Sequence, residues 1–383
     1  MKLFQCQACG QVLHFENTRC ESCGRTLGYL PDARLLSALE QDPSVERGAR
    51  PEDVASGPEA SVRPAAARPK ELWHAWNQPG VRYRFCANAE LHACNWLLPE
   101  ASSEAYCRAC RHNRIVPDLS APENLARWQK LELAKHRLFY TLTRLGLPLL
   151  TRAKDPDHGL AFDFLAYPLE GAGPKVMTGH EDGLITIALT EADDAERERM
   201  RLAMGETYRT LLGHFRHEVG HWFWDVLVRD GAPGRLDAFR ALFGDERRDY
   251  AEALKIHYKE GPPPNWSEKF ITIYASTHPW EDWAETWAHY LHIVDTLETA
   301  HVFGLRVRPR IAPGEALSAD LEYDPYSAGP EIQRLIDDWL PLTFAMNSLN
   351  RSMGQPDLYP FIISPPVIEK LGFVHRLVHN QDR

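Results

Sequence analysis

The segment 217–221, His-Glu-Val-Gly-His, places two histidines and a glutamate at a spacing that could bind a metal ion. On a helix, residues four apart lie on the same face, so His217 and His221 could point at one ion. Glu218 would lie on the neighbouring face, within reach of a metal-bound water. Two imidazole ligands beside a carboxylate base are typical of zinc sites that hydrolyse peptide bonds.

The same pattern could belong to an amphipathic helix with two surface histidines. The flanking residues argue against this alternative because they are apolar on all sides, which predicts a buried helix: Leu211, Leu212, Phe215, Val219, Trp222, Phe223 and Val226. Buried histidines beside a glutamate need partners, and a metal ion would satisfy all three side chains. We therefore favour the metal site.

A catalytic zinc ion normally has three protein ligands and one open position for water. Asp225 lies one turn beyond His221, but a third group on one straight helix cannot easily close around a single ion. We expect Asp225 to cap the helix or to support the metal ligands by a hydrogen bond without binding the metal itself. A better third ligand is Glu281, on a helix predicted to run from Pro279 to about Val294.

Glu281, Glu285 and His289 would stack on one face of that helix. A buried acidic pair on a tryptophan-rich helix is costly unless a metal or imidazole N–H groups neutralise it. We therefore predict Glu281 as the zinc ligand and Glu285 as the acceptor of a hydrogen bond from a ligating histidine. The alternatives are a first-turn carboxylate that stabilises the helix dipole at Glu281, a surface salt bridge at Glu285, and His289 as the ligand.

All eight cysteines lie within the first 110 residues: Cys6, Cys9, Cys20, Cys23, Cys86, Cys94, Cys107 and Cys110. Three of the four pairs are C-x-x-C, which in a chain with no signal peptide at its start predicts structural zinc rather than disulfides. The spacing leaves sequential and interleaved pairing open. We choose the sequential sets 6/9/20/23 and 86/94/107/110, because closing shorter loops costs less entropy.

The composition excludes some classes of protein. The chain has 383 residues, of which 44% are hydrophobic and 25% charged, and its net charge is -10. This acidic balance argues against non-specific binding to nucleic acid or to an anionic membrane. No apolar run approaches the roughly 20 residues of a membrane helix, so a cytoplasmic location is the default expectation.

The segments around these residues predict two domains. Residues 1–117 form a zinc-ribbon module with a linker at about 43–70, which is rich in Ala, Pro, Glu and Arg. Residues 118–383 form the second domain. Its predicted helices and strands indicate an α+β fold: helix 121–147, strands 160–167 and 183–189, helix 193–205, the two motif helices, and helix 331–353, which Pro341 should kink or break.

These motifs resemble a known clan. HExxH followed about sixty residues later by Glu281-x-x-x-Glu285 looks like the gluzincins, and the stretch 281–285 is similar to the anthrax lethal factor catalytic domain and the Mlc titration factor peptidases. Together with the ribbon, the chain resembles the bacterial family called "putative zinc-binding metallopeptidases" over nearly its full length. The resemblance implies a zincin-like, mostly helical metallopeptidase domain with a small sheet. In lethal factor, a tyrosine seven residues before the glutamate ligand helps to stabilise the oxyanion, so that role carries over to Tyr274 here; the alternative is a core tyrosine.

We therefore predict a zinc-dependent peptidase that acts on a peptide or protein, with one catalytic and two structural zinc ions. The zinc lowers the pKa of its bound water, Glu218 takes the proton, and Tyr274 helps the zinc to stabilise the oxyanion. One competing hypothesis is a non-catalytic adaptor that binds a protein partner through the ribbon or the peptidase-like domain. Another is a protease that the ribbon directs to nucleic acid, which the acidic charge ranks last.

Overall fold

The structure is a computed structural model that describes residues 2–43, 71–166, 178–204, 210–311 and 317–380. The chain packs into two compact units. The first unit comprises residues 2–143 and 148–194, and the second comprises residues 144–147 and 195–383. The predicted boundary after residue 117 stays a prediction. Apart from Pro43, the predicted linker 43–70 lies outside the described residues.

The cysteine-rich part of the first unit is built on a five-stranded antiparallel sheet in the order β3-β4-β5-β6-β7. Its strands are β3 (Leu27–Leu30), β4 (Leu35–Gln41), β5 (Trp73–Ala75), β6 (Gln78–Phe85) and β7 (Leu97–Pro99). A separate two-stranded hairpin, β1 (Phe4–Gln5) with β2 (Val12–Leu13), precedes it. The side chains of Leu30, Leu39, Tyr83 and Leu97 form a buried cluster on this sheet.

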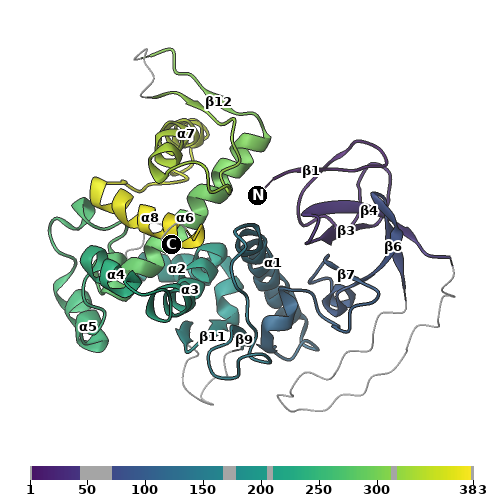
Figure 1. The fold of residues 1–383 in the computed structure, drawn as a ribbon, viewed down its shortest axis with the longest axis horizontal. Coiled ribbons are helices and arrows are strands. Elements are labelled where there is room, and N and C mark those ends of the chain that lie inside the picture. Colours follow the sequence, from purple (N-terminus) through teal and green to yellow (C-terminus); the bar gives the residue numbers. More distant parts are fainter. Residues whose placement is uncertain (1, 44–70, 167–177, 205–209, 312–316, 381–383) are drawn as a thin grey trace. The chain divides into compact units, whose positions relative to one another are not determined.

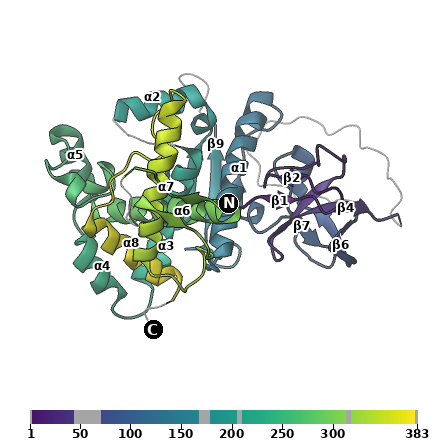
Figure 2. The same cartoon turned by 90° about the horizontal axis from the view of Figure 1, so that it is seen from above.

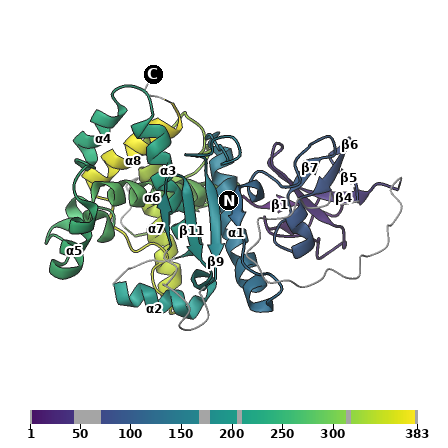
Figure 3. The same ribbon diagram turned by 90° about the horizontal axis from the view of Figure 1, so that it is seen from below.

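The rest of the first unit is a helix with a four-stranded sheet in the order β10-β11-β9-β8. Figure 3 labels the helix α1 and the two central strands, β9 and β11. The helix α1 runs from Pro122 to Arg144, and the strands are β8 (Asn113–Ile115), β9 (Ala161–Leu165), β10 (Gly179–Glu181) and β11 (Leu184–Ala188). Strand β9 is parallel to both β8 and β11, and β10 is the antiparallel edge strand. The helix and two strands predicted here agree with these elements within a few residues.

The second unit is mostly helical (Figure 1). Its helices are α2 (Asp194–Met204, whose first residue belongs to the first unit), α3 (Leu211–Trp224), α4 (Arg235–Phe243), α5 (Tyr250–Glu260), α6 (Pro279–Val302), α7 (Ile332–Ser352) and α8 (Pro365–Val378). One short strand pair, β12 (Arg306–Val307) with β13 (Ala319–Asp320), lies between α6 and α7 in the sequence. Helix α6 packs against α3, α7 and α8, so it is the central helix of this unit (Figure 2).

Helix α6 starts where the sequence predicts but ends later. Pro279 occupies its first turn, and the side chain of His278 accepts a hydrogen bond from the backbone N–H of Trp280. The helix continues to Val302 instead of about Val294, because apolar residues remain buried along its last turns: Leu297 and Ala300.

The sequence predicts that Pro341 kinks or breaks its helix; α7 runs through this proline, so the predicted break is wrong, while the kink stays a prediction. Proline removes one backbone hydrogen bond. Burial on both sides of it, through Leu335, Trp339 and Leu342, holds the helix together. Both units together make the chain a mixed α+β protein. No helix in the described ranges combines the length and the apolar character that a membrane crossing needs.

Candidate metal centre and its surroundings

The HExxH segment lies on α3, which packs closely against α6 at Gly220. A Cβ atom at this position would lie 3.0 Å from Cδ1 of Trp287 and 3.2 Å from Cα of Ala284. The indole N–H of Trp283 donates a 2.8 Å hydrogen bond to the Gly220 carbonyl. The glycine inside the motif therefore permits the close approach that brings side chains of α3 and α6 to one site.

Three side chains from these helices converge on one point. The Nε2 atoms of His217 and His221 lie 3.2 Å apart. Oε2 of Glu281 lies 3.0 Å from Nε2 of His217 and 3.6 Å from Nε2 of His221. Zinc bonds of about 2.0–2.1 Å in a tetrahedron give ligand–ligand distances of about 3.3–3.4 Å, so the three atoms have the spacing of a zinc site.

The orientation of His217 is fixed by Glu285. Nδ1 of His217 donates a 2.6 Å hydrogen bond to Oε1 of Glu285, which turns Nε2 towards the other two ligand atoms. Burial alone would lower the pKa of His217, but hydrogen bonds to Glu281 and Glu285 outweigh it and raise that pKa. The contact is the one that a supporting carboxylate makes with a metal-binding histidine.

Glu281 is buried in the first turn of α6, with 2% of its surface exposed. Burial would raise the pKa of its carboxyl group, but the histidines His221 and His217 hold that pKa well below the usual value. Its two oxygens have different partners: Oε1 accepts a 2.7 Å hydrogen bond from the hydroxyl of Tyr250, whereas Oε2 faces the ring nitrogens of His217 and His221. A buried carboxylate oxygen left in this way between two imidazole nitrogens fits a metal ion.

The predicted catalytic side chains lie at this site but outside the group of converging ligand atoms. Glu218 follows His217 on α3 and is buried. Tyr274 begins a short 3₁₀ turn (Tyr274–Ser276), and its ring centroid lies 5.9 Å from that of His217. Burial, with the nearby charge of Glu281, raises the pKa of Tyr274, so its hydroxyl remains a hydrogen-bond donor.

Two other residues considered in the sequence analysis contribute no atom to the group formed by His217, His221 and Glu281. Asp225 is the C-terminal cap residue of α3, and its carboxylate pairs with Arg229 at 2.6 Å. His289, the alternative ligand, is buried on α6 and forms a 2.7 Å hydrogen bond with the hydroxyl of Tyr359. Burial lowers the pKa of His289 to about 4, so this side chain is neutral at pH 7.

Three contacts that anchor the site were not predicted. Nζ of Lys370, on α8, pairs at 2.6 Å with the buried carboxylate of Asp282, next to Glu281. Nε2 of His278 donates a 3.1 Å hydrogen bond to the Arg248 carbonyl. The third is the bond from Tyr250 to Glu281. A lone lysine in the middle of α8 and a lone tyrosine at the start of α5 belong to no sequence pattern that would indicate these contacts.

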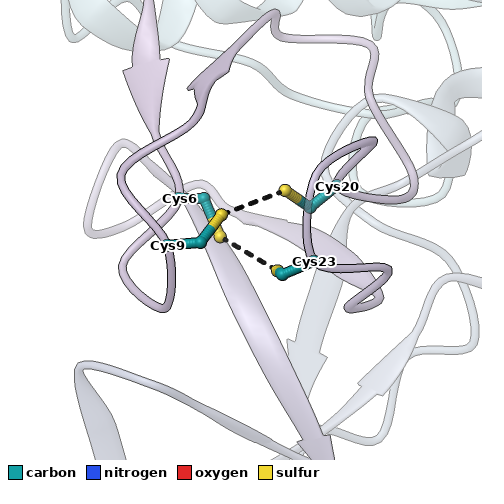
Figure 4. A group of neighbouring side chains, drawn as sticks. All are labelled: Cys6, Cys9, Cys20 and Cys23. Carbon is teal, nitrogen blue, oxygen red and sulfur yellow. Dashed lines mark hydrogen bonds between the residues drawn. The ribbon is translucent and has the colours of Figure 1, made fainter.

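The first four cysteines form one cluster in the first unit (Figure 4). Sγ of Cys6 lies 3.7 Å from Sγ of Cys23, and Sγ of Cys9 lies 3.6 Å from Sγ of Cys20. These distances are too long for a disulfide of about 2.05 Å. They match the sulfur spacing of about 3.8 Å that zinc–sulfur bonds of about 2.3 Å give in a tetrahedron.

The other four cysteines form a second, fully buried cluster: Cys86, Cys94, Cys107 and Cys110. Sγ of Cys94 and Cys107 lie 3.8 Å apart. Nε2 of His136, on α1, lies 3.5 Å from Sγ of Cys110, and its Nδ1 donates a 2.6 Å hydrogen bond to the Glu132 carbonyl. The structure thus groups the cysteines in sequential sets, and the second set rests on a polar contact from α1 that was not predicted.

Comparisons with known proteins agree with a zinc site in the peptidase-like region and with zinc-ribbon cysteines near the N-terminus. Residues 124–377 match the family described as "Putative zinc-binding metallo-peptidase", and residues 3–59 and 52–121 each match a zinc-ribbon domain. Uncharacterized proteins of Mycobacterium bovis and of Mycobacterium tuberculosis are 40% identical to the chain over 379 residues, which is 99% of this chain and 95% of theirs. No solved structure matches the chain at a significant level.

Proposed function

The chain belongs to the family of putative zinc-binding metallopeptidases, and we propose that it is a gluzincin-type peptidase that hydrolyses peptide bonds. The observation that carries this proposal is the convergence of His217, His221 and Glu281, whose three ligand atoms lie within 4.8 Å of one another. This set leaves room for one further ligand on a four-coordinate ion, as catalytic zinc sites do and structural sites do not.

In the proposed reaction, the residues around the metal site have different roles. A zinc ion held there would supply Lewis acidity and a water molecule with a lowered pKa. Glu218 follows the first ligand on α3, and its carboxylate would act as the general base that takes a proton from the attacking water. The same side chain would then pass the proton to the leaving amine, so the proposal needs no second acid.

The neighbours of the ligands support this chemistry. Glu285 holds His217 in the tautomer whose Nε2 faces the ion. Tyr274 keeps its proton at neutral pH and is a candidate donor to the oxyanion that forms when the carbonyl is attacked. In this proposal, the two cysteine clusters hold structural zinc ions, and the ribbon remains a candidate surface for a protein partner.

Peptide cleavage by the zinc-loaded wild type and by Glu218→Gln tests the proposal. The amide of glutamine cannot accept the proton, so we expect turnover to fall by a factor of about 10²–10⁴ while zinc stays bound. Cleavage of an unbiased peptide library, read by mass spectrometry, gives turnover, and elemental analysis gives zinc. Full activity in Glu218→Gln, or no cleavage by the zinc-loaded wild type of any peptide offered, contradicts the proposal.

A further inference from the structure

Because Tyr250 forms a hydrogen bond with one carboxylate oxygen of Glu281, the two oxygens of that carboxylate have different partners. The tyrosine hydroxyl donates a 2.7 Å hydrogen bond to Oε1, while Oε2 faces Nε2 of His217 at 3.0 Å and Nε2 of His221 at 3.6 Å. A carboxylate can bind a metal through one oxygen or through both. Here only Oε2 is directed towards the metal site, because Oε1 is occupied by a protein hydrogen bond.

The contact is built into the ends of two helices. The side chain of Asp249 accepts a 2.9 Å hydrogen bond from the Glu252 N–H, which fixes Tyr250 as the first residue of α5. The 3.1 Å hydrogen bond from His278 to the Arg248 carbonyl links the N-terminal cap residue of α6 to the segment just before α5. The rings of Tyr250 and His278 also pack edge to face, with centroids 5.3 Å apart.

We propose that Tyr250 is a positioning residue that restricts Glu281 to binding the metal through Oε2 alone. This inference rests on the proposed zinc site. Two imidazoles and both oxygens of Glu281 would provide four protein ligands, which is the number found in closed structural sites. By holding Oε1, Tyr250 keeps one position free for the water molecule that the reaction consumes.

The test compares Tyr250→Phe with Tyr323→Phe. The control also loses a tyrosine hydrogen bond to a carboxylate, since the hydroxyl of Tyr323 donates a 3.0 Å hydrogen bond to Asp338 on α7. Each protein is loaded with cobalt(II), and the spectrum of His217→Ala loaded in the same way is subtracted to remove the contribution of the cysteine sites. We expect Tyr250→Phe to keep its metal, to show cobalt d–d bands altered by a higher coordination number, and to lose turnover by a factor of about 10–100.

Tyr323→Phe should match the wild type in both measurements. An unchanged cobalt spectrum in Tyr250→Phe overturns the inference, even if the variant is less stable, because a purely structural role would lower stability alone. A wild-type spectrum identical to that of His217→Ala would instead show that the HExxH segment holds no metal, which overturns the proposed function. The spectrum decides the role of Tyr250 even if the peptide substrates tested are not cleaved.

Discussion

At the candidate metal centre, two of the ligand side chains also form a hydrogen bond on the side that faces away from the converging atoms. Nδ1 of His217 is bonded to Glu285, and Oε1 of Glu281 is bonded to Tyr250. These bonds fix which nitrogen and which oxygen can bind a metal, so the site is arranged before an ion arrives. Such pre-organisation lowers the cost of binding, because fewer side chains must be ordered on loading.

Tyr274→Phe tests whether this tyrosine acts on the reaction. We expect the turnover of the zinc-loaded variant to fall by a factor of about 10²–10³, the usual cost of losing one oxyanion donor, because the phenyl ring keeps the packing against His217. Zinc content should stay the same, which separates Tyr274 from the ligands. Steady-state kinetics on a cleaved peptide measures the loss, and unchanged turnover would leave Tyr274 as a core residue only.

The metal-ligand residues of this centre were predictable from the sequence, whereas the side chains that hold these ligands by hydrogen bonds were predictable only for Glu285. The HExxH motif and Glu281-x-x-x-Glu285 predict metal ligands from the sequence alone, because helical spacing places the side chains of each motif on one face of its helix. Tyr250 lies 31 positions before Glu281, on another helix. Only the tertiary packing of α5 against the start of α6 brings the two together, and no local pattern encodes that.

Between elements, the distance from α3 to α6 is set at Gly220. Alanine is otherwise a better helix former than glycine, by about 1 kcal/mol. Here its methyl group would meet Trp287 at 3.0 Å and the Ala284 backbone at 3.2 Å, and the backbone atom cannot move away easily. The glycine therefore costs helix propensity but permits the contact on which the site depends.

Gly220→Ala should consequently destabilise the protein by about 1–3 kcal/mol, as overpacking does, and weaken zinc binding at the HExxH site. Gly329→Ala is a suitable control, because the nearest atom to its new methyl group would be Oγ of Ser327 at 3.8 Å. Denaturant unfolding of both variants measures the difference. A Gly220→Ala protein as stable as the wild type would show that the helix contact is looser than described.

Helix α8 is tied to α6 by the buried pair of Lys370 and Asp282. Lys370→Met leaves the carboxylate without its cation, which costs about 3–5 kcal/mol for a buried pair. Adding Asp282→Asn to this variant removes the charge and should restore much of the stability. Urea unfolding of the single and double variants tests this, and equal stability of the two would contradict it.

The same pair predicts a dependence on pH. Burial outweighs the attraction of Lys370 and raises the pKa of Asp282 to about 7, above its unfolded value near 3.8. The folded state then binds more protons than the unfolded state between these values, so the stability from this group falls as pH rises from about 4 to 7. Without Lys370 the charged form is less favourable still, so the loss in Lys370→Met should be larger at pH 8 than at pH 6.

Over the whole molecule, the sequence predicted the elements better than their assembly. Apolar periodicity and helix-start residues located α1, α6 and the strands β9 and β11, because those signals are local. They could not show that α6 continues to Val302 or that α7 passes through Pro341, since both depend on burial against other helices. The grouping of cysteines in sequential sets followed from loop entropy.

The two cysteine clusters differ in their surroundings. Cys9 and Cys23 of the first cluster are exposed, whereas all four cysteines of the second are buried. Both clusters bear on the central claim, because their metal must be counted separately from that of the HExxH site.

The most direct test of that claim is the number of zinc ions per chain, measured by elemental analysis on the wild type and on His217→Ala with the cysteines intact. Among the described residues, the structure holds two groups of four cysteines, the group of His217, His221 and Glu281, and a group of Cys110, Glu132 and His136. Because this last group shares Cys110 with the second cysteine cluster, we count one ion for the two, and we predict three zinc ions falling to two. A wild-type count of two that stays at two in His217→Ala would mean that the HExxH helix holds no metal. The peptidase account would then be wrong, and a non-catalytic adaptor would explain the chain better.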